Sequence, residues 1–327
     1  MIYLTTIRDV AYKAGVSVAT VSRVINDNGY VNQDTRKKVE EAIESLNYQP
    51  NSIARSLFKK ESKTIGIIVP DITNPFFPQL VRGIEDYLVK NGYTTLLCNS
   101  DENTQKERLY LEVMKQKYVD GLIVVSNTID EEMIKNFDRP IIALDRSIHK
   151  NIPTFMINNR EGGKVATQHL IDIGCKNIAH IKGPAHIENS HSRYQGYIDI
   201  IKDDSLVIEG EYNLKIATQR SIELLSEHPE IDGVFAGNDL MALGVVKAAH
   251  HLNKSIPDNL AVIGFDGIGL TEMASPEIST ISQPIYDMSI EAARALKAII
   301  EGENIEPKSY EFPFTLIQRQ STSKKGE

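Results

Sequence analysis

Residues 7–25 read IRDVAYKAGVSVATVSRVI, which has the spacing of two short helices joined by a tight turn. Gly15 supplies the turn, and the small side chain of Ala11 allows the two helices to cross closely. The side chains expected to face the core between them are Val10, Ala11, Ala14, Val16, Val21 and Val24. The stretch therefore predicts a helix-turn-helix, with a helical cap that binds nothing as the alternative.

The second of these helices presents short side chains and one arginine to the outside. Ser17 is expected to cap it. The residues left on its outward face are Val18, Ala19, Thr20, Ser22 and Arg23. An arginine can donate two hydrogen bonds to a guanine edge, which gives ~1–3 kcal/mol of discrimination, and hydroxyl groups can reach phosphates. We expect this helix to read the DNA major groove.

The charge of the chain is unevenly distributed. Residues 1–60 carry a net charge of +3 and the remaining residues −11, which together give −8. A basic head on an acidic body predicts that only the head meets a polyanion such as DNA. Three charges are few enough that chance is the alternative explanation.

Length and composition exclude several classes of protein. At ~150 residues per domain, 327 residues predict two or three domains. No apolar run approaches the ~18 residues of a membrane span, and the N-terminus has no apolar signal core. Cys98 and Cys175 are too few for a disulfide framework. We expect a cytoplasmic protein with reduced thiols, no membrane association and no secretion.

After residues 6–48, which read as three helices, and the charged linker 59–63, strand-like runs alternate with helical stretches. The expected strands are TIGIIV, TTLLCN, GLIVVS, PIIALD, NIAHIK, GVFAGN and LAVIGF, with a further apolar run near Leu206. The expected helices lie near 76–91, 104–117, 129–136, from about 192, over 217–228 and over 239–252. This alternation predicts an α/β fold of parallel, doubly wound sheets in two lobes.

Two long stretches carry a family resemblance. DVAYKAGVSVATVSRVIN (9–26) and TRKKVEEAIESLNYQPNSIARSL (35–57) resemble the head of the LacI/GalR family of bacterial repressors, and the resemblance continues to about Arg319. It implies a helix-turn-helix head on a two-lobed effector domain like the type I periplasmic binding proteins. The implied domains are a head (1–50), a hinge helix and linker (51–63), an effector domain (64–320) and a tail (321–327), with one lobe at about 64–160 and 290–320 and the other at about 161–289.

The resemblance also implies how the head binds DNA. It nominates Val18, Ala19 and Arg23 for base edges, and for phosphates Thr6, Ser17, Thr20 and Asn26. Because Val18 and Ala19 are apolar, they can touch only thymine methyl groups, which leaves Arg23 with most of the polar specificity. One head reads only a few base pairs, so a homodimer on a palindromic double-stranded DNA operator is expected.

The segment NSIARSLF (51–58) resembles the hinge helix of the family. Eight residues are fewer than the ~12–15 at which an isolated helix is stable in water, so the segment should fold only against a partner. The resemblance implies that two hinge helices enter the minor groove. Leu57 would be wedged between base pairs with Ala54 beside it and Asn51 at the start of the helix. The alternative is that Leu57 packs against the body.

The body resembles the sugar-binding domain of the family, and most nearly its ribose-type members. The residues that carry this resemblance follow predicted strands, where open α/β sheets bind ligands: Asn74, Phe76, Phe77, Asp145, Arg146, Arg193, Asn238, Asp239, Asp266 and Gln283, with Tyr212 added as an aromatic clamp. Phenylalanines can cover the C–H face of a sugar, while carboxylates and arginines can bind its hydroxyl groups. Three aspartates against two arginines favour a neutral ligand over a phosphorylated one.

Each of these residues has a structural alternative. Asn74 before Pro75 is typical of a turn, Asp266 before Gly267 is typical of a loop cap, and a Phe pair is common in a core. The alignment at Tyr212 can slip, because the stretch between Arg193 and Tyr212 is shorter than usual in the family. The combination at successive strand ends favours the ligand site.

Enzyme and metal sites are not expected. The sequence contains no GxxxxGK[ST] phosphate loop, GxSxG elbow, HExxH or paired CxxC motif. His186, Glu188 and His191 lie close together, but their irregular spacing favours a solvated surface over a metal site. No cofactor is expected.

The sequence thus predicts a repressor of a sugar-utilisation operon that a neutral sugar, ribose first, releases from its operator. One alternative is a purine-type or catabolite-control regulator that uses a corepressor, either a small molecule or a phosphocarrier protein. The other is a sugar-binding receptor whose head no longer binds DNA.

Overall fold

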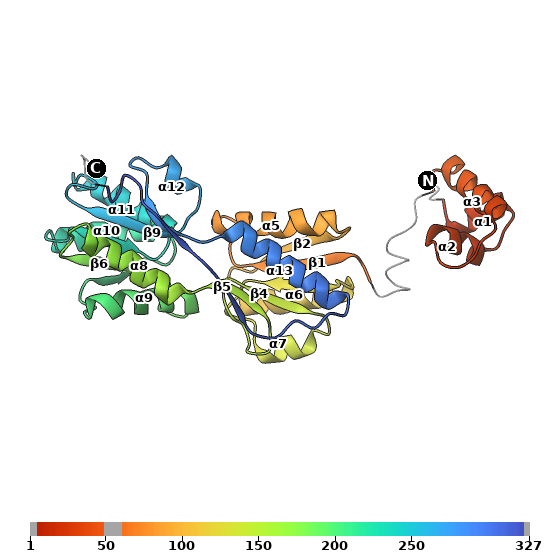
Figure 1. The fold of residues 1–327 in the computed structure, drawn as a ribbon, viewed down its shortest axis with the longest axis horizontal. Helices are drawn as coiled ribbons and strands as arrows, with labels where there is room; N and C mark the ends of the chain where they lie inside the picture. The colour runs from red at the N-terminus through yellow and green to blue at the C-terminus, as the bar shows by residue number, and fades with distance from the viewer. Residues whose placement is uncertain (1–4, 49–60, 324–327) are drawn as a thin grey trace. The chain divides into compact units, whose positions relative to one another are not determined.

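The computed structural model describes residues 5–48 and 61–323, in two compact units whose boundary along the chain lies between Ser62 and Lys63 (Figure 1). We describe each unit by itself. The smaller unit is entirely helical in its described part, and the larger unit is built of two α/β lobes. The expected fold class is confirmed.

The head consists of three helices around a small core. They are α1 (Ile7–Ala14), α2 (Val18–Ile25) and α3 (Gln33–Ser45). Gly15 ends α1 with a φ of 67°, in the left-handed region that glycine adopts at little cost, and Ser17 Oγ caps α2 by accepting the Thr20 N–H at 3.1 Å. The core residues are Val10, Ala11, Val21, Val24, Val39 and Ala42. The two-helix turn is thus held together by α3.

The first lobe is a six-stranded parallel sheet in the order β11-β5-β4-β3-β1-β2. Its strands are β1 (Thr64–Val69), β2 (Thr94–Asn99), β3 (Gly121–Val124), β4 (Ile141–Leu144), β5 (Thr154–Ile157) and β11 (Ser309–Phe312). Its helices are α5 (Phe76–Lys90), α6 (Thr104–Gln116), α7 (Glu131–Asn136) and α13 (Ile285–Ile300).

The second lobe has a similar sheet in the order β12-β10-β9-β8-β6-β7, in which only the β10–β12 pair is antiparallel. Its strands are β6 (Ile178–Lys182), β7 (Val207–Glu209), β8 (Gly233–Ala236), β9 (Ala261–Asp266), β10 (Ser279–Ser282) and β12 (Thr315–Ile317). Its helices are α8 (Asn159–Asp172), α9 (Glu188–Ile201), α10 (Leu214–Glu227), α11 (Asp239–His251) and α12 (Leu270–Met273).

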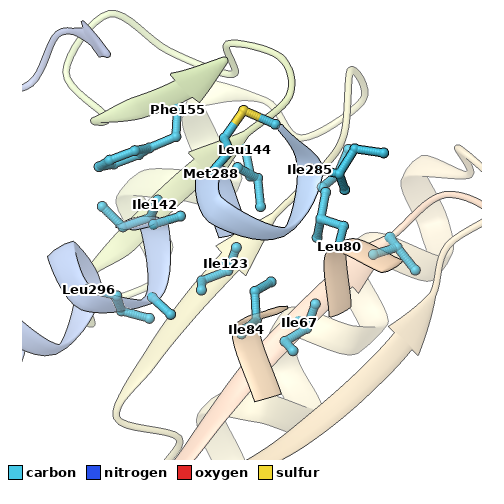
Figure 2. Packing of buried hydrophobic residues seen from close by; sticks show 14 of the residues in the cluster. Ile67, Leu80, Ile84, Ile123, Ile142, Leu144, Phe155, Ile285, Met288 and Leu296 are labelled. Carbon is cyan, nitrogen blue, oxygen red and sulfur yellow. The ribbon is translucent and has the colours of Figure 1, made fainter. Parts of the chain in front are cut away.

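Helices cover both faces of each sheet. In the first lobe Ile67 packs with α5 and α13, as Figure 2 shows, while the next residue, Ile68, packs with α6 and α7 on the opposite face. In the second lobe Val262 packs with α10 and α11, and Ile263 packs with α8 and α9. Burial on both faces explains why the central strands read as continuous apolar runs.

The lobe boundaries differ from those expected. The chain crosses between the lobes three times, after β5, after β10 and after β11. Helix α13 begins at Ile285, which is buried in the core of the first lobe, so the expected boundary at 289/290 is too late. Strand β12 hydrogen-bonds to β10, so residues 315–317 belong to the second lobe rather than the first.

Residues 321–322 are not a free tail. Ser321 and Thr322 are buried, Ser321 Oγ donates to the Val262 carbonyl at 2.5 Å, and Thr322 Oγ1 lies 2.9 Å from His169 Nε2. The expected tail at 321–327 is therefore wrong at these two residues, because their hydroxyl groups lock the end of the chain onto β9 and α8.

A neutral histidine lies inside the second lobe. His180 on β6 is fully buried, its ring stacks on Phe235 with centroids 4.6 Å apart, and its Nδ1 lies 2.9 Å from the Phe235 carbonyl. Its Nε2 has no hydrogen-bond partner among the described residues. Burial lowers the pKa of His180 to about 3.

We expect this histidine to weaken the fold in mild acid. In the unfolded chain His180 takes up a proton near its ordinary pKa of 6.5, whereas the folded protein excludes that proton down to about 3. The contribution of His180 to the free energy of unfolding is therefore fully present above pH 6.5 and is progressively lost as the pH falls below that value. Between pH 7.5 and 5.5 this histidine should lower the free energy of unfolding by about 1.4 kcal/mol. Buried His169, whose pKa burial also lowers, adds to the same trend.

Urea unfolding of the full chain at the two pH values measures this loss. His180→Gln should be less stable at pH 7.5 but lose less on acidification, while His251→Gln, which changes an exposed histidine, should behave like the parent. An acid-induced loss in His180→Gln equal to that of the parent would contradict the assignment.

Candidate functional site

A cavity of about 360 Å³ lies between the two lobes of the larger unit. Its walls come from the loops that follow β1, β2 and β4 in the first lobe and β6, β7, β8 and β9 in the second. These loops leave the carboxyl ends of parallel strands, the edge at which open α/β sheets bind ligands. The volume is in the range of small-molecule sites.

The cavity brings together nine of the eleven residues that the sequence predicts for ligand binding. They are Asn74, Phe76, Phe77, Asp145, Arg146, Arg193, Tyr212, Asn238 and Asp266. Their role as ligand contacts stays a prediction, but their convergence follows from their places at successive strand ends.

Aromatic side chains supply the apolar part of the wall. Phe76 and Phe77 begin α5, are both buried, and meet edge to face with centroids 5.2 Å apart at 89°. Tyr212 lies on the second lobe, where its ring fills the space beside Gly183: a Cβ at Gly183 would come within 2.4 Å of that ring. Such a set of rings can pack on the C–H face of a small ligand.

One arginine is held between two carboxylates. The Nη1 of Arg146 lies 2.7 Å from Glu102 Oε1, and its Nε lies 3.3 Å from Asp145 Oδ2. Asn189, from the other lobe, donates its Nδ2–H to the same Asp145 Oδ2 at 2.9 Å. Asp145 Oδ1 is buried and has no hydrogen-bond partner within the part of the chain that the structure describes. Asp145, a residue of the cavity wall, thus keeps an acceptor oxygen whose hydrogen-bonding capacity is unused.

The second arginine is also fully engaged. Arg193 Nη1 lies 3.0 Å from Asp266 Oδ1 and donates to the Gly237 carbonyl at 2.7 Å. Its Nε donates to Asn159 Oδ1, and its guanidinium stacks 3.8 Å from the centre of the Phe265 ring. Burial raises the pKa of Asp266, and the nearby positive charge of Arg193 opposes that rise.

Asp239 and Gln283 do not line the cavity, contrary to expectation. Asp239 is fully buried: its Oδ2 accepts the N–H groups of Gly267 and Ile268 at 2.7 and 2.8 Å, and its Oδ1 accepts the Thr280 hydroxyl at 2.7 Å. Gln283 donates its Nε2–H to Asp266 Oδ1 at 2.8 Å. Both residues act from behind the wall, where they fix Asp266 and the loop that follows it.

Sequence reasoning missed half of the lining. The additional residues are Pro70, Asp71, Asp101, Glu102, Pro184, His186, Ile187, Asn189, Glu211 and Asn213. Asp71, Asp101 and Glu102 follow β1 and β2, so the same strand-end argument applied to every strand finds them. The lining thus holds six carboxylates, on Asp71, Asp101, Glu102, Asp145, Glu211 and Asp266, against two arginines. It is more acidic than the sequence indicated.

In the head, the residues predicted for DNA form the outward face of α2 and its flanks. Val18, Ala19 and Arg23 are exposed on α2, and Thr20 is partly exposed. Thr6, Ser17 and Asn26 cap helices α1 and α2 at their ends. Asn51, Ala54 and Leu57, predicted for the minor groove, lie outside the described residues. The structure therefore presents the predicted base-reading side chains on one surface.

Two properties of the described residues bear on other functions. Within 5–48 and 61–323 no group of three or more His, Cys, Asp or Glu side chains is placed to hold a metal ion. His186, Glu188 and His191 form no such group. None of the helices in that part of the chain is long and apolar enough to cross a membrane.

Family models match nearly the whole chain. Residues 6–51 match the model of bacterial regulatory proteins of the lacI family, and residues 62–320 match that of periplasmic binding proteins and sugar binding domains of the LacI family. The boundary between the two matches lies beside the boundary between the two structural units.

Individual proteins show the same relationship. A ribose operon repressor from Halalkalibacterium halodurans is 45% identical over 99% of this chain and 98% of its own length. The structure of a LacI family transcriptional regulator from Enterococcus faecium with bound ribose is 32% identical, with a TM-score of 0.73 over 80% of this chain and 98% of that one. The lac repressor dimer bound to operator and an anti-inducer is 25% identical, with a TM-score of 0.88 over 97% of this chain and 99% of that one.

The ribose operon repressor and the lac repressor are repressors rather than enzymes, and the two family models that match this chain correspond to the two units described above. The chain belongs to the LacI family and is a transcriptional repressor of the sugar-operon type.

Proposed function

We propose that this chain represses a ribose-utilisation operon and that D-ribose, bound in the cavity between the lobes, releases it from its operator. The observation that carries the proposal is the buried, unpartnered Asp145 Oδ1, which lies in a wall that also holds the Phe76–Phe77 pair. A free sugar has both of the matching surfaces, hydroxyl donors and an apolar C–H face. The similarity to a ribose operon repressor and to a ribose-bound regulator supports ribose among the sugars.

The charge of the cavity supports an uncharged ligand. Both arginines are already paired with carboxylates, and the other lining carboxylates leave an excess of negative charge. Carboxylates accept hydrogen bonds from hydroxyl groups without needing a counter-charge on the ligand, at about 1.5–3 kcal/mol for each charge-assisted bond. A sugar with several hydroxyl groups can therefore bind tightly in a cavity that repels anions.

The switch is a coupling between the sugar site and the DNA site. The Asn189–Asp145 hydrogen bond joins the two lobes directly across the cavity. A sugar that contacts both of these walls stabilises one arrangement of the two lobes. If that arrangement binds DNA more weakly than the others, the sugar acts as an inducer. In this proposal the hinge segment 51–63 transmits the change to the head.

A homodimer follows from the same proposal, because two heads read the two halves of a palindrome. The first lobe offers a surface for it at the free edge strand β2 and the flanking helices. Leu97 on β2, Val89 on α5 and Leu109 on α6 expose 40%, 54% and 55% of their side chains. Apolar residues at an unpaired strand edge suit a second copy of the chain better than water.

Calorimetric titration with D-ribose tests the ligand, since the chain has no Trp for a fluorescence signal. We expect one site per chain. Asp145→Asn should bind ribose at least tenfold more weakly, because it removes a charged acceptor, whereas Asp258→Asn, an exposed substitution on the second lobe, should bind as the parent does. Binding of a purine or another sugar instead of ribose would show that the repressor controls an operon for a different pathway. No binding across such a panel would favour a phosphocarrier protein as corepressor.

Binding to DNA tests the head. With a palindromic operator selected from a random pool by the full chain, Arg23→Ala should bind that operator about 5- to 150-fold more weakly, which corresponds to the loss of ~1–3 kcal/mol for one bidentate guanine contact. Affinity for a scrambled duplex should change little. The control is Arg220→Ala, which removes an exposed arginine from α10 of the second lobe and should bind the operator as the parent does. If the parent protein selects no operator from the pool, the function would instead be that of a sugar receptor that does not bind DNA.

Sedimentation tests the dimer. Leu97→Asp places a charge on the β2 edge and should convert the dimer to a monomer. Ile216→Asp changes an equally exposed apolar residue on α10 of the second lobe and should leave the dimer intact. A dimer that survives Leu97→Asp unchanged would remove the β2 edge from the interface.

A further inference from the structure

Glu102 has an environment that sets it apart from the other lining carboxylates. It lies in the loop between β2 and α6, just before the N-terminal cap of α6, and about four-fifths of its side chain is buried. Asp101 and Glu102 both adopt positive φ, 54° and 53°. Non-glycine residues rarely adopt this conformation, so the surrounding contacts must hold the loop in place.

Three contacts fix the carboxylate of Glu102. Its Oε1 lies 2.7 Å from Arg146 Nη1, and its Oε2 accepts the Asn127 Nδ2–H at 3.2 Å. His186, from the opposite lobe, brings its Nε2 to 4.0 Å from the same oxygen. The carboxylate therefore occupies the side of Arg146 that an anionic group of a ligand would otherwise approach.

The loop that carries Asn127 is itself anchored. Glu107 on α6 is fully buried, and its carboxylate accepts the hydroxyl groups of Ser126 and Thr128, the neighbours of Asn127, at 2.7 and 2.5 Å. A partly buried series of hydrogen bonds thus links α6 through this loop to Glu102. It holds the Glu102 carboxylate against Arg146 in the absence of any ligand.

Arg146 is consequently the residue through which a change in a neighbouring charge can alter whether the cavity binds neutral or anionic ligands. The other arginine, Arg193, is enclosed by Asn159, the Gly237 carbonyl and Asp266 and stacks on Phe265. If Glu102 loses its charge, Asp145 is the carboxylate that still pairs with Arg146. Its Oδ2 lies 3.3 Å from Arg146 Nε, which is farther than the 2.7 Å between Arg146 and Glu102. A guanidinium with free N–H donors is a strong binder of phosphate groups.

We propose that Glu102 is the residue that makes this cavity select a free sugar over its phosphate ester, by neutralising the Arg146 guanidinium. The inference rests on the proposed function, because it assumes that the cavity is the sugar site. It goes further in naming the residue that determines specificity and the ligand class that this residue rejects. Glu102 acts through Arg146 and is not assigned a contact with the sugar.

The test compares neutral and anionic ligands on matched variants of the full chain. D-ribose, D-ribose 5-phosphate, D-ribose 1-phosphate and inorganic phosphate are titrated by calorimetry at pH 8, where imidazole side chains are uncharged. Glu102→Gln keeps the size of the side chain and one acceptor oxygen for Arg146, removes the charge, and replaces the other oxygen with an amide donor. Glu112→Gln makes the same change in charge on the exposed face of α6.

We expect the parent and Glu112→Gln to bind none of the three anions measurably. Glu102→Gln should bind at least one of them at least tenfold more tightly than the parent does, while its affinity for ribose changes less than that. Asn127→Ala loosens Glu102 without removing its charge, so it should gain less anion binding than Glu102→Gln does. A merely structural role of Glu102 would weaken ribose binding in Glu102→Gln without any gain in anion binding.

The outcomes separate this inference from the proposed function. If no anion binds Glu102→Gln better than the parent, the role of Glu102 is overturned, whether or not ribose binds. If the parent does not bind ribose but Glu102→Gln gains phosphate binding, the role of Glu102 stands and ribose is the wrong sugar. If the parent already binds a phosphate ester tightly, Glu102 does not reject anions and the inference fails.

Discussion

The buried arginines of the cavity impose the main physical constraint on this structure. A guanidinium removed from water loses several kcal/mol of hydration unless nearby groups replace it, and an unpaired one is strongly destabilising. Arg146 and Arg193 are both almost fully buried, and each is paired with a carboxylate that leaves the end of a different strand. Within each lobe, the loops that carry these partners must therefore converge at the cavity with little freedom. The convergence of polar groups that serves binding is also a condition for folding.

The sequence predicts the central sheets well because their strands are buried on both faces. Runs such as TIGIIV in β1 contain no polar residue after the first threonine, and their short length and β-branched residues favour a buried strand over a helix. Helix α8 is not among the helices that the sequence predicts, and Gly162 and Gly163 interrupt its helical pattern. In the structure these glycines allow close packing: a Cβ at Gly163 would lie 2.4 Å from the Arg193 carbonyl oxygen. Tertiary contact outweighs the helix propensity that the sequence shows.

The sequence predicts only part of the cavity lining, because a linear pattern gives the position of a residue but not the direction of its side chain. Position after a strand identifies residues at the correct edge of a sheet, but it does not tell which side chains face the cavity and which turn behind its wall. Asp239 and Asp266 both stand at this edge, yet the backbone N–H groups after β9 and the Thr280 hydroxyl enclose Asp239 completely. Conversely, Glu102 reaches Arg146 only because its side chain is long and its backbone adopts positive φ. Neither fact is visible in a linear pattern.

The three crossings of the chain between the lobes have a consequence for biosynthesis. The first lobe needs α13 and β11, and the second needs β12 and the locked residues Ser321 and Thr322, so each lobe contains segments from the last 45 residues of the chain. A ribosome that adds residues in order can release a complete three-helix head long before it releases either sheet in full. The cavity between the lobes is therefore assembled last. A nascent chain stalled before α13 would carry a finished DNA-reading head with no means of responding to the sugar.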